Sequence, residues 1–475
     1  MIEDTIRLVG LNVVFVVAGL AIVLAFRIPL AGAWLPTAFG LAPVTGMLAC
    51  SLVATQLAAI GVPVGIITVT MATTAAIAAV ALVGRRVQPS QGSLRPQEQS
   101  RLATAIELGI LCLLALVSFS ALRLAAVMPL SSWDGWAIWG ARAHTLFESG
   151  DAWSAPFQEQ AYAQQHLDYP LLYPSLEALG LHAIGRFDVS LVDIQPMLLL
   201  VACAIAAWAL LRMAVPPWLA AIAGVGLLGC GTVVQNASWN YADGLLAAVS
   251  ALGLICLGLW LTHASSVALC FAGLFLTSSA LLKNEGLMFA LAALVAALAA
   301  SLVSGRRMRA VVFVGVAIGV ARLPWQAFVA INDLGTADYD FALLASPTYV
   351  VDNANRVELA SRALASDLVH TWTLPTAVGA LTLLGALLTR HYALFVLIVG
   401  WAIISFAGLV ASYVASKHDV TWHLDTSSDR VVATLATGML MISPLVGWKL
   451  WSLTRPELER MRRIRFVHRK QSAAG

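Results

Sequence analysis

The chain of 475 residues is 60% hydrophobic and only 11% charged, with a mean hydropathy of +0.84 and a formal net charge of +3. This composition excludes a soluble globular protein, because soluble domains carry about 25% charged residues. A helix that crosses a bilayer needs about 20 mostly apolar residues, and the chain contains many such runs. Unbroken apolar runs favour helices over a closed barrel. We therefore expect an all-α polytopic transmembrane protein.

Fourteen apolar runs are candidate membrane spans, so we expect about 12–14 helices. The runs are 8–26, 37–59, 64–83, 104–128, 171–185, 189–211, 217–234, 241–262, 267–282, 286–304, 310–331, 369–389, 392–413 and 431–451. The first three runs and the linker after them form a predicted N-terminal membrane unit, residues 1–101. Residues 102–451 form the predicted core, and residues 452–475 form a basic tail.

The charged residues separate the connecting segments into two sides. Three segments are strongly basic, and the positive-inside rule predicts that they face the cytoplasm. They contain Arg85, Arg86, Arg95 and Arg101, then Arg306, Arg307 and Arg309, and finally the tail from Lys449 to Lys470. The segments 131–169 and 332–368 are acidic, so we expect them on the outer side together with the loop 415–430.

This sidedness conflicts with the number of apolar runs. Six runs lie between the outer segment 131–169 and the inner Arg306-Arg307 loop, although opposite sides require an odd number of crossings. The run 171–185 would be only about 22 Å long, short of the roughly 30 Å that a crossing needs. The run 217–234, which Pro216-Pro217 opens, is nearly as short. We expect one of these two runs to cross only halfway and to open a cavity.

Asp134 lies at the predicted membrane rim between Trp133 and Trp136. An ionised carboxylate at this depth must face water, a partner or a substrate, because its exposure to lipid is costly. It is either a capping residue within an ordinary aromatic belt or a general base that accepts a proton from an attacking hydroxyl. Arg142 follows on the same predicted helix and His166 on the returning loop, and this company favours the base.

The loop re-enters the membrane through His166-Leu167-Asp168-Tyr169-Pro170, where the proline fixes the start of a helix. Tyr169 is either an interfacial belt residue or a substrate contact. His166 and Asp168 are either parts of the helix entry or ligands for sugar hydroxyls, or they bind a metal together with Asp134. No spacing singles out a metal site, so we predict none, and Mg²⁺ or Mn²⁺ is the only cofactor left open. The six cysteines all lie in apolar runs and are interpreted as packing residues.

Three further charged positions fall on the predicted outer side. Lys283 and Glu285 interrupt two apolar runs, and they either pair within a turn or bind a phosphate and a sugar hydroxyl. Asp243 begins a helix, where the helix dipole favours a carboxylate, so capping and substrate binding both remain open. The positive-inside rule does not account for Arg430, because that rule places arginines on the cytoplasmic side. Its forked guanidinium suits a phosphate. The alternatives for Arg430 are snorkelling or pairing with Asp429.

The order of these motifs resembles the GT-C superfamily of integral membrane glycosyltransferases. It is most similar to the bacterial branch related to dolichyl-phosphate-mannose-protein mannosyltransferases and aminoarabinose transferases. The resemblance covers residues 104–451 and rests on Trp133-Asp134, His-x-Asp-Tyr-Pro-x-x-x-Pro from His166 to Pro174, Tyr-x-Asp ending at Asp243, Lys-x-Glu-Gly from Lys283 to Gly286, and the segment Trp422 to Arg430, which contains His423. The first-loop motif departs from the family in having a single Asp followed by Gly.

The resemblance implies a GT-C-like fold in a bacterial inner membrane, with a periplasmic active-site cavity and a cytoplasmic C-terminus. It implies that a sugar moves from a polyprenyl-phosphate donor to a hydroxyl of a lipid, glycan or protein acceptor, with inversion at the anomeric carbon. Asp134 would be the base, and Lys283 and Arg430 would bind the phosphate. The other expected substrate contacts are Trp133, Trp136, Arg142, His166, Asp168, Tyr169, Asp243, Glu285 and His423. We expect no nucleic-acid partner.

Other functions fit parts of the same pattern. A transporter or flippase for a lipid-linked or amphipathic substrate is the main alternative, since broken helices and membrane charges mark transporters too. A transporter concentrates its charges near the midplane, whereas these charges gather at one predicted rim. A non-catalytic assembly subunit would tolerate loss of Asp134. Among enzymes, a lipopolysaccharide ligase or a glycan polymerase also acts on polyprenyl-linked donors. Arg322, inside the run 310–331, is either a further headgroup contact or a buried salt-bridge partner.

Overall fold

The computed structural model of the protein describes residues 2–87, 90–97, 99–128, 130–336 and 338–472. The side chains of Arg85, Arg86 and the predicted basic tail from residue 454 onward lie outside the described residues. All regular elements in the described part are helices, and the only β-type pairing found there is an isolated bridge between Tyr339 and Ser416. The expectation of an all-α polytopic membrane protein is therefore confirmed.

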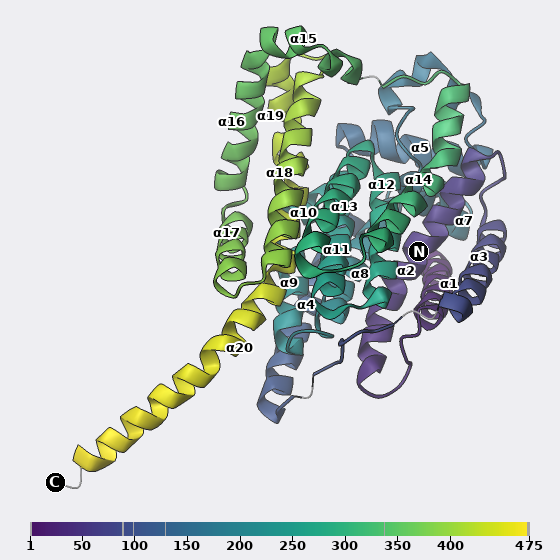
Figure 1. Ribbon diagram of the computed structural model, residues 1–475. Helices are drawn as coiled ribbons and strands as arrows, with labels where there is room; N and C mark the ends of the chain where they lie inside the picture. The colour runs from purple at the N-terminus through teal and green to yellow at the C-terminus, as the bar shows by residue number, and fades with distance from the viewer. Residues whose placement is uncertain (1, 88–89, 98, 129, 337, 473–475) are drawn as a thin grey trace.

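The helices follow one another through the whole described chain (Figure 1). Their bounds are α1 Ile2–Ala25, α2 Leu35–Ala59, α3 Ile66–Val87, α4 Arg101–Val127, α5 Ala141–Ser149, α6 Ala155–Gln158, α7 Leu172–Ile184, α8 Ile194–Leu211, α9 Pro217–Gly229, α10 Gly231–Ser238, α11 Ala242–His263, α12 Ser266–Leu282, α13 Asn284–Ser304, α14 Met308–Ile331, α15 Pro347–Asp352, α16 Ala354–His370, α17 Thr373–Leu388, α18 Tyr392–Val414, α19 Val420–Val431 and α20 Ala433–Ser472. Short turns of other helix types are η1 Gly32–Trp34, η2 Asp134–Gly140, η3 Gln160–Gln165 and η4 Phe341–Ala345.

Ten helices in the described residues are long and apolar enough to cross a membrane. The number rises to 12 if each of two bent helix pairs counts as one span: α9 with α10, bent by 55°, and α16 with α17, bent by 92°. The apolar helix α12 has 17 residues and is slightly shorter than the others. The number reaches the lower limit of the expected 12–14 helices only when both bent pairs are counted.

Helix α7, from one of the two runs expected to cross only halfway, is short and lies at one end of the bundle. It has 13 residues, so it is about 20 Å long at 1.5 Å per residue. Ser175 near its start lies 3.4 Å from Thr55 at the end of α2, and the carbonyl of Ile184 at its end accepts a hydrogen bond from Arg7 in α1. Helices α1 and α2 pack as a hairpin, so both contacts lie at one end of the bundle. The other candidate run forms the bent pair α9 and α10 instead.

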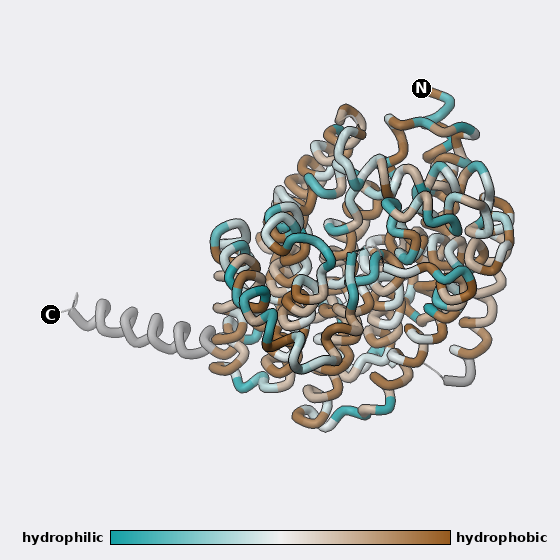
Figure 2. Tube along the Cα trace, turned by 90° about the horizontal axis from the view of Figure 1, so that it is seen from above, coloured by the Kyte–Doolittle hydropathy of each residue, from teal (hydrophilic) through white to brown (hydrophobic). Residues whose placement is uncertain are grey.

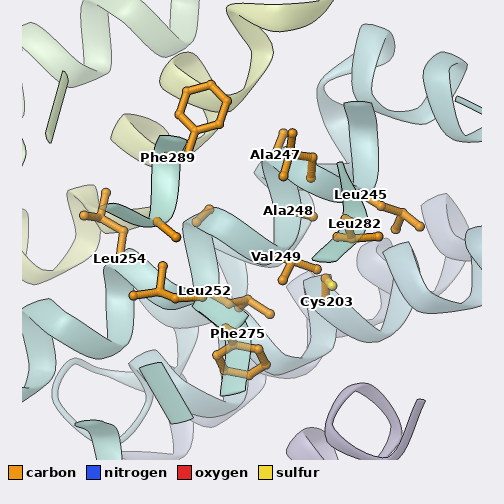
Figure 3. Close-up of a cluster of buried hydrophobic side chains, with 14 of the residues drawn as sticks. Cys203, Leu245, Ala247, Ala248, Val249, Leu252, Leu254, Phe275, Leu282 and Phe289 are labelled. Atoms are coloured by element: carbon orange, nitrogen blue, oxygen red, sulfur yellow. The ribbon is translucent and has the colours of Figure 1, made fainter. Parts of the chain in front are cut away.

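Helix α11 lies at the centre of the bundle and is surrounded by other helices. Every residue from Ala242 to Leu261 is buried. Figure 3 shows its side chains packed with Cys203 of α8, Phe275 of α12 and Phe289 of α13. All six cysteines are free and lie in helices or at helix ends. Cys50, Cys203 and Cys256 are buried as expected for packing residues, whereas Cys112 is exposed on α4.

The two ends of the bundle differ in charge, and we name them for what they carry. At the basic end, Arg306 donates to the carbonyl of Leu261, and the backbone of Ser93 bonds to that of His263. The segments around Arg95 and Arg306, predicted to share a side, therefore do so. At the other end, the site end, lie the loops predicted to face outward. This is the upper end in Figure 1, and Figure 2 views it from above with its hydrophilic segments in teal.

Candidate functional site

Five charged side chains form a continuous row at the site end, which we call the charge row. Arg430 Nη1 lies 2.8 Å from Asp134 Oδ2 and 3.9 Å from Asp243 Oδ2. Lys283 Nζ lies 2.9 Å from Asp243 Oδ1 and 3.2 Å from Glu285 Oε1. All five were singled out in the sequence, and the structure brings them together from four distant parts of the chain.

Local structure fixes the place of Asp134. It begins η2, a single stretch of π-helix, a rare conformation that is frequent at functional sites. A Cβ at Gly135 would lie 2.2 Å from the carbonyl oxygen of Trp239, so only glycine allows this close approach. Asn240 Nδ2 also donates to the Gly135 carbonyl at 3.2 Å. The turn that carries Asp134 is therefore packed directly against the start of α11.

The charge row is open at one end and closed at the other. The Asp134 side chain is 27% exposed, whereas that of Asp243 is only 5% exposed. Asp243 also lies in the first turn of α11, where the helix dipole stabilises a carboxylate. A water-soluble group can therefore approach Asp134, while Asp243 serves mainly to hold the two cations.

Aromatic rings and neighbouring carboxylates keep both cations charged. Burial alone would lower the pKa of Lys283, but the carboxylates of Asp243 and Glu285 raise it above its ordinary value. The Lys283 ammonium lies 5.9 Å from the ring centre of Tyr169, and the Arg430 guanidinium lies 4.5 Å from that of Tyr241. Such cation–π contacts stabilise positive charge.

Several buried polar atoms beside the charge row have no hydrogen-bond partner within the described part of the chain. They are Arg430 Nε, Glu285 Oε2 and Asp168 Oδ1. Arg430 uses the same atom, Nη1, for both of its carboxylates, so its Nε is left as a donor for an anion. Buried polar groups are nearly always satisfied, so these atoms indicate a ligand with both acceptors and donors.

Asp168 and Arg322 are linked through Asn284, next to Lys283. Asn284 Nδ2 donates to Asp168 Oδ2 at 2.6 Å, and Arg322 Nη2 donates to Asn284 Oδ1 at 2.9 Å. Burial raises the pKa of Asp168 above its ordinary value. Arg322 also bonds to the carbonyl of Ala280. No carboxylate among the described residues forms a salt bridge with Arg322, so the structure rules out the salt-bridge partner of the two alternatives considered for it.

Arg142 lies beneath the loop 131–169 rather than in the charge row. It is fully buried, and its Nη2 donates to the backbone carbonyl of Tyr169 at 2.5 Å. The rings of Phe157 and Trp325 lie 5.7 and 5.9 Å from its guanidinium carbon. Burial lowers its pKa to about 10. These contacts support Tyr169, while Arg142 Nε and Nη1 have no hydrogen-bond partner within the described residues.

Asp338 joins the three loops at the site end, and its role was not predicted. Its Oδ1 lies 2.8 Å from His418 Nε2, and its Oδ2 lies 3.4 Å from His166 Nδ1. The nearby His423 bonds to Ser416 at 2.8 Å and lies beside the ring of Tyr339. The loops 131–169, 332–368 and 415–430 therefore meet above the charge row, as their shared side predicted.

Two exposed tryptophans flank the open end of the charge row. Trp133 and Trp136 are 59% and 48% exposed, and their rings meet edge to face at 5.1 Å. The third tryptophan of this loop, Trp139, is buried and stacks on Tyr169 at 5.8 Å. The exposed pair offers an apolar surface beside Asp134, and the buried one anchors the loop.

A mostly apolar groove of about 1410 Å³ runs between the bent pair α9 and α10 on one side and the helices α17 and α20 on the other. Gln97 and Trp218 line it toward the basic end, and Thr232 and Trp372 line it toward the site end. The bend between α9 and α10, at Cys230, also borders it. Trp372 Nε1 donates to the backbone carbonyl of Asp429 at 3.0 Å, so this lining residue contacts the helix turn that carries Arg430.

Several residues of the site were not assigned a role from the sequence. Tyr241 and Asn284 lie inside the motifs, but the sequence predicted roles only for the charged residues next to them. Asp338 and His418 lie in loops whose irregular sequence gives no periodic signal. Within the described residues, no group of three or more His, Cys, Asp or Glu side chains is arranged to hold a metal ion.

Comparison with known proteins adds no relative from which a function could be carried over. No protein-family model, curated protein sequence or solved structure matches the chain. The fold and the apolar helices define an integral membrane protein of the all-α class. Its function must therefore be inferred from the charge row and its surroundings.

Proposed function

We propose that the protein is a membrane glycosyltransferase. It moves a sugar from a polyprenyl-phosphate donor to a hydroxyl of a lipid, glycan or protein acceptor, on the periplasmic face of a bacterial inner membrane. The observation that carries the proposal is the charge row, in which a partly exposed carboxylate, Asp134, lies 2.8 Å from Arg430, a cation whose buried Nε has no hydrogen-bond partner within the described residues. The basic end then faces the cytoplasm, in accordance with the positive-inside rule.

The proposed reaction needs a base and a stabilised leaving group. The proton of the acceptor hydroxyl moves to Asp134, and the acceptor oxygen bonds to the anomeric carbon from the face opposite the phosphate. The bond between the anomeric carbon and the phosphate oxygen breaks, and both electrons leave with the phosphate. Arg430 and Lys283 stabilise the charge that develops there. Arg430 occupies Asp134 Oδ2, so Oδ1 is the oxygen left to accept the proton.

The apolar groove supports a lipid-linked donor. A polyprenyl chain is insoluble in water, and its phosphate must reach the rim while the chain stays within the membrane. The groove follows the length of the helices, and its lining residue Trp372 contacts the helix turn that carries Arg430. Trp133 and Trp136 provide ring surfaces on which a sugar can stack at the open end of the row.

A transporter or flippase for a lipid-linked substrate is the second candidate. The broken span formed by α9 and α10 favours it, since discontinuous helices are common in transporters. The two functions differ in chemistry. A transferase breaks the bond between sugar and phosphate, whereas a flippase moves the intact donor across the membrane.

The test uses the full chain in lipid vesicles with a set of labelled polyprenyl-phosphate sugars and membrane-derived acceptors. We expect mass spectrometry to find released polyprenyl phosphate and a glycosylated acceptor. Asp134→Asn should abolish release and transfer without unfolding the protein. Glu148→Gln, which changes an exposed carboxylate of the same loop, is the matched control and should stay active. Intact donor moved between leaflets would establish the flippase, and full activity of Asp134→Asn would remove Asp134 as the base.

A further inference from the structure

A second group of buried polar side chains lies beneath η2, and the proposed reaction does not use it. Glu177 of α7 is 1% exposed and lies near Asp193, which precedes α8. Gln195 packs against Gly180, one turn after Glu177 on the same helix. Asn240, which precedes α11, also lies beside the Glu177 carboxyl. We call these four side chains, Glu177, Asp193, Gln195 and Asn240, the acid–amide cluster.

Glu177 has no cation to balance a negative charge. Neither carboxyl oxygen of Glu177 has a hydrogen-bond partner within the described residues. The oxygen and the nitrogen of the Gln195 amide have none there either. An ionised carboxylate buried in this way is costly, so the group stays neutral instead. A protonated carboxyl has one donor and one acceptor, which are the groups that a primary amide complements.

The charged groups on the surrounding helices are engaged elsewhere. Their partners are as follows: Arg142 of α5 bonds to Tyr169, Arg7 of α1 to Glu3 and Ile184, Asp134 of η2 to Arg430, and Asp243 of α11 to Lys283. The facing parts of α2 and α12 contribute only cysteine thiols as titratable groups. On α7 itself, burial lowers the pKa of His182, which favours its neutral form. The charged neighbour that acts on the Glu177 carboxyl is thus Asp193, itself an acid.

Hydrogen bonds connect Asn240 of this cluster to Tyr173, one turn before Glu177 on α7, and to the residue after Asp134. Tyr173 donates to Asn240 Oδ1 at 2.8 Å, and Asn240 Nδ2 donates to the carbonyl of Gly135 at 3.2 Å. Asn240 is fully buried and has a positive φ of 60°, so its backbone is held in the left-handed region by these contacts. Gly135 is the residue directly after Asp134.

We propose that Glu177 is a positioning residue that acts in its protonated form, holding the Asn240 amide against Gly135 and thereby the carboxylate of Asp134 in its working orientation. This inference rests on the proposed function, which makes Asp134 the base. Deprotonation would place an unbalanced charge beside Asn240 and disturb the turn above it. Burial raises the pKa of Glu177 far above the carboxyl range, which agrees with a neutral resting state.

The kinetic test compares three variants across pH with the wild type. Glu177→Gln keeps the neutral shape, so it should retain kcat and lose the fall in kcat at alkaline pH. Glu177→Ala should lower kcat by about 100-fold, the scale expected for a misplaced reacting group, with little change in KM. Glu107→Gln is the matched control, because Glu107 is also buried but bonds to Gln99 and Trp208 away from the site. Its pH profile should match the wild type.

A second readout does not need catalysis and separates this inference from the proposed function. Infrared spectra should show a neutral carboxylic acid at neutral pH that is missing in Glu177→Gln. With fluorotryptophan incorporated, the resonance of Trp136, next to Asp134 on η2, should move at alkaline pH in the wild type but not in Glu177→Gln. Absence of transfer in the wild type would overturn the proposed function alone. An unchanged kcat in Glu177→Ala, or the same pH response of Trp136 in Glu177→Gln, would overturn the role of Glu177.

Discussion

The charge row and the acid–amide cluster each include a residue at the start of α11, Asp243 and Asn240, and they differ in how buried carboxyl groups are accommodated. In the charge row, Arg430 and Lys283 lie within salt-bridge distance of three carboxylates. In the acid–amide cluster, Glu177 has amides and another acid around it and no cation. A carboxyl group in a low-dielectric interior either pairs with a cation or gives up its charge.

The difference predicts opposite responses to mutation and pH. Neutralising one member of the charge row leaves another charge without its partner, so the cost is large. Neutralising Glu177 with an isosteric amide preserves its resting charge, so the cost is small at neutral pH. Variants in the two groups therefore test this difference.

The largest effect is expected for Lys283→Met. This change leaves Asp243 and Glu285 buried beside each other with only Arg430 nearby, and breaking a buried pair in this way costs about 3–5 kcal/mol. Thermal unfolding of the variant in detergent would measure the loss. The double variant Lys283→Met with Asp243→Asn should recover part of it, and equal stability of single and double variants would show that the pair is not coupled.

A large effect on binding is expected for Arg430→Ala. Loss of the guanidinium removes the free Nε donor and the partner of Asp134, so affinity for a polyprenyl-phosphate donor should fall by about 2 kcal/mol or more. Binding of labelled donor to the protein in nanodiscs would measure it. Arg186→Ala, which removes an exposed arginine away from the charge row, is the control and should bind normally. Unchanged affinity in Arg430→Ala would refute the phosphate role.

A smaller, pH-dependent effect is expected for Glu177→Gln. The pKa of Glu177 is raised in the folded protein, so folding stability falls as pH rises from its ordinary value of 4.5 toward the raised one, by up to about 1.4 kcal/mol per pH unit. Burial also raises the pKa of Asp193, to about 7, so both acids contribute below that pH. Glu177→Gln removes only the Glu177 share of this slope. Thermal unfolding of the variant should show a shallower loss of stability with rising pH than the wild type, and an unchanged slope would place the proton elsewhere.

The smallest effect is expected for Asp338→Asn. Its two histidine contacts are partly exposed, and such pairs contribute about 0–1 kcal/mol. Global stability should therefore change little, while hydrogen exchange in the loops 131–169 and 415–430 should increase. A large fall in unfolding temperature would mean that Asp338 supports the core of the site.

The sequence predicted the membrane class and the convergence of the outer loops because both depend on composition and sidedness. It offered the pairing of Lys283 with Glu285 as one alternative, which the structure shows, but it did not predict the partners that come from distant parts of the chain. Arg430 pairs with Asp134, 296 positions away, although Asp429 is adjacent, because α19 packs so that its arginine faces η2. The sequence analysis assigned no role to Glu177, which lies inside an apolar run. An acidic residue within such a run usually has a function, and this position could have indicated one.

The choice between two short runs could not be made from the sequence. The runs 171–185 and 217–234 have similar length and hydropathy, and either could have satisfied the required parity. The position of α7 depends on contacts with a distant part of the chain: Arg7 and Arg186 link the end of α7 to the first two turns of α1. A side chain more than 170 residues away leaves no trace in the local pattern.

The enclosure of α11 has a consequence for how the protein is assembled. Its Gly258 faces Leu394 of α18 and Leu445 of α20, both of which are synthesised long after it. Until these C-terminal helices are inserted, one side of α11 has only lipid or the insertion machinery as a neighbour. A chain shortened before α18 should therefore be recognised by membrane quality control, even though the residues of the N-terminal half are all present.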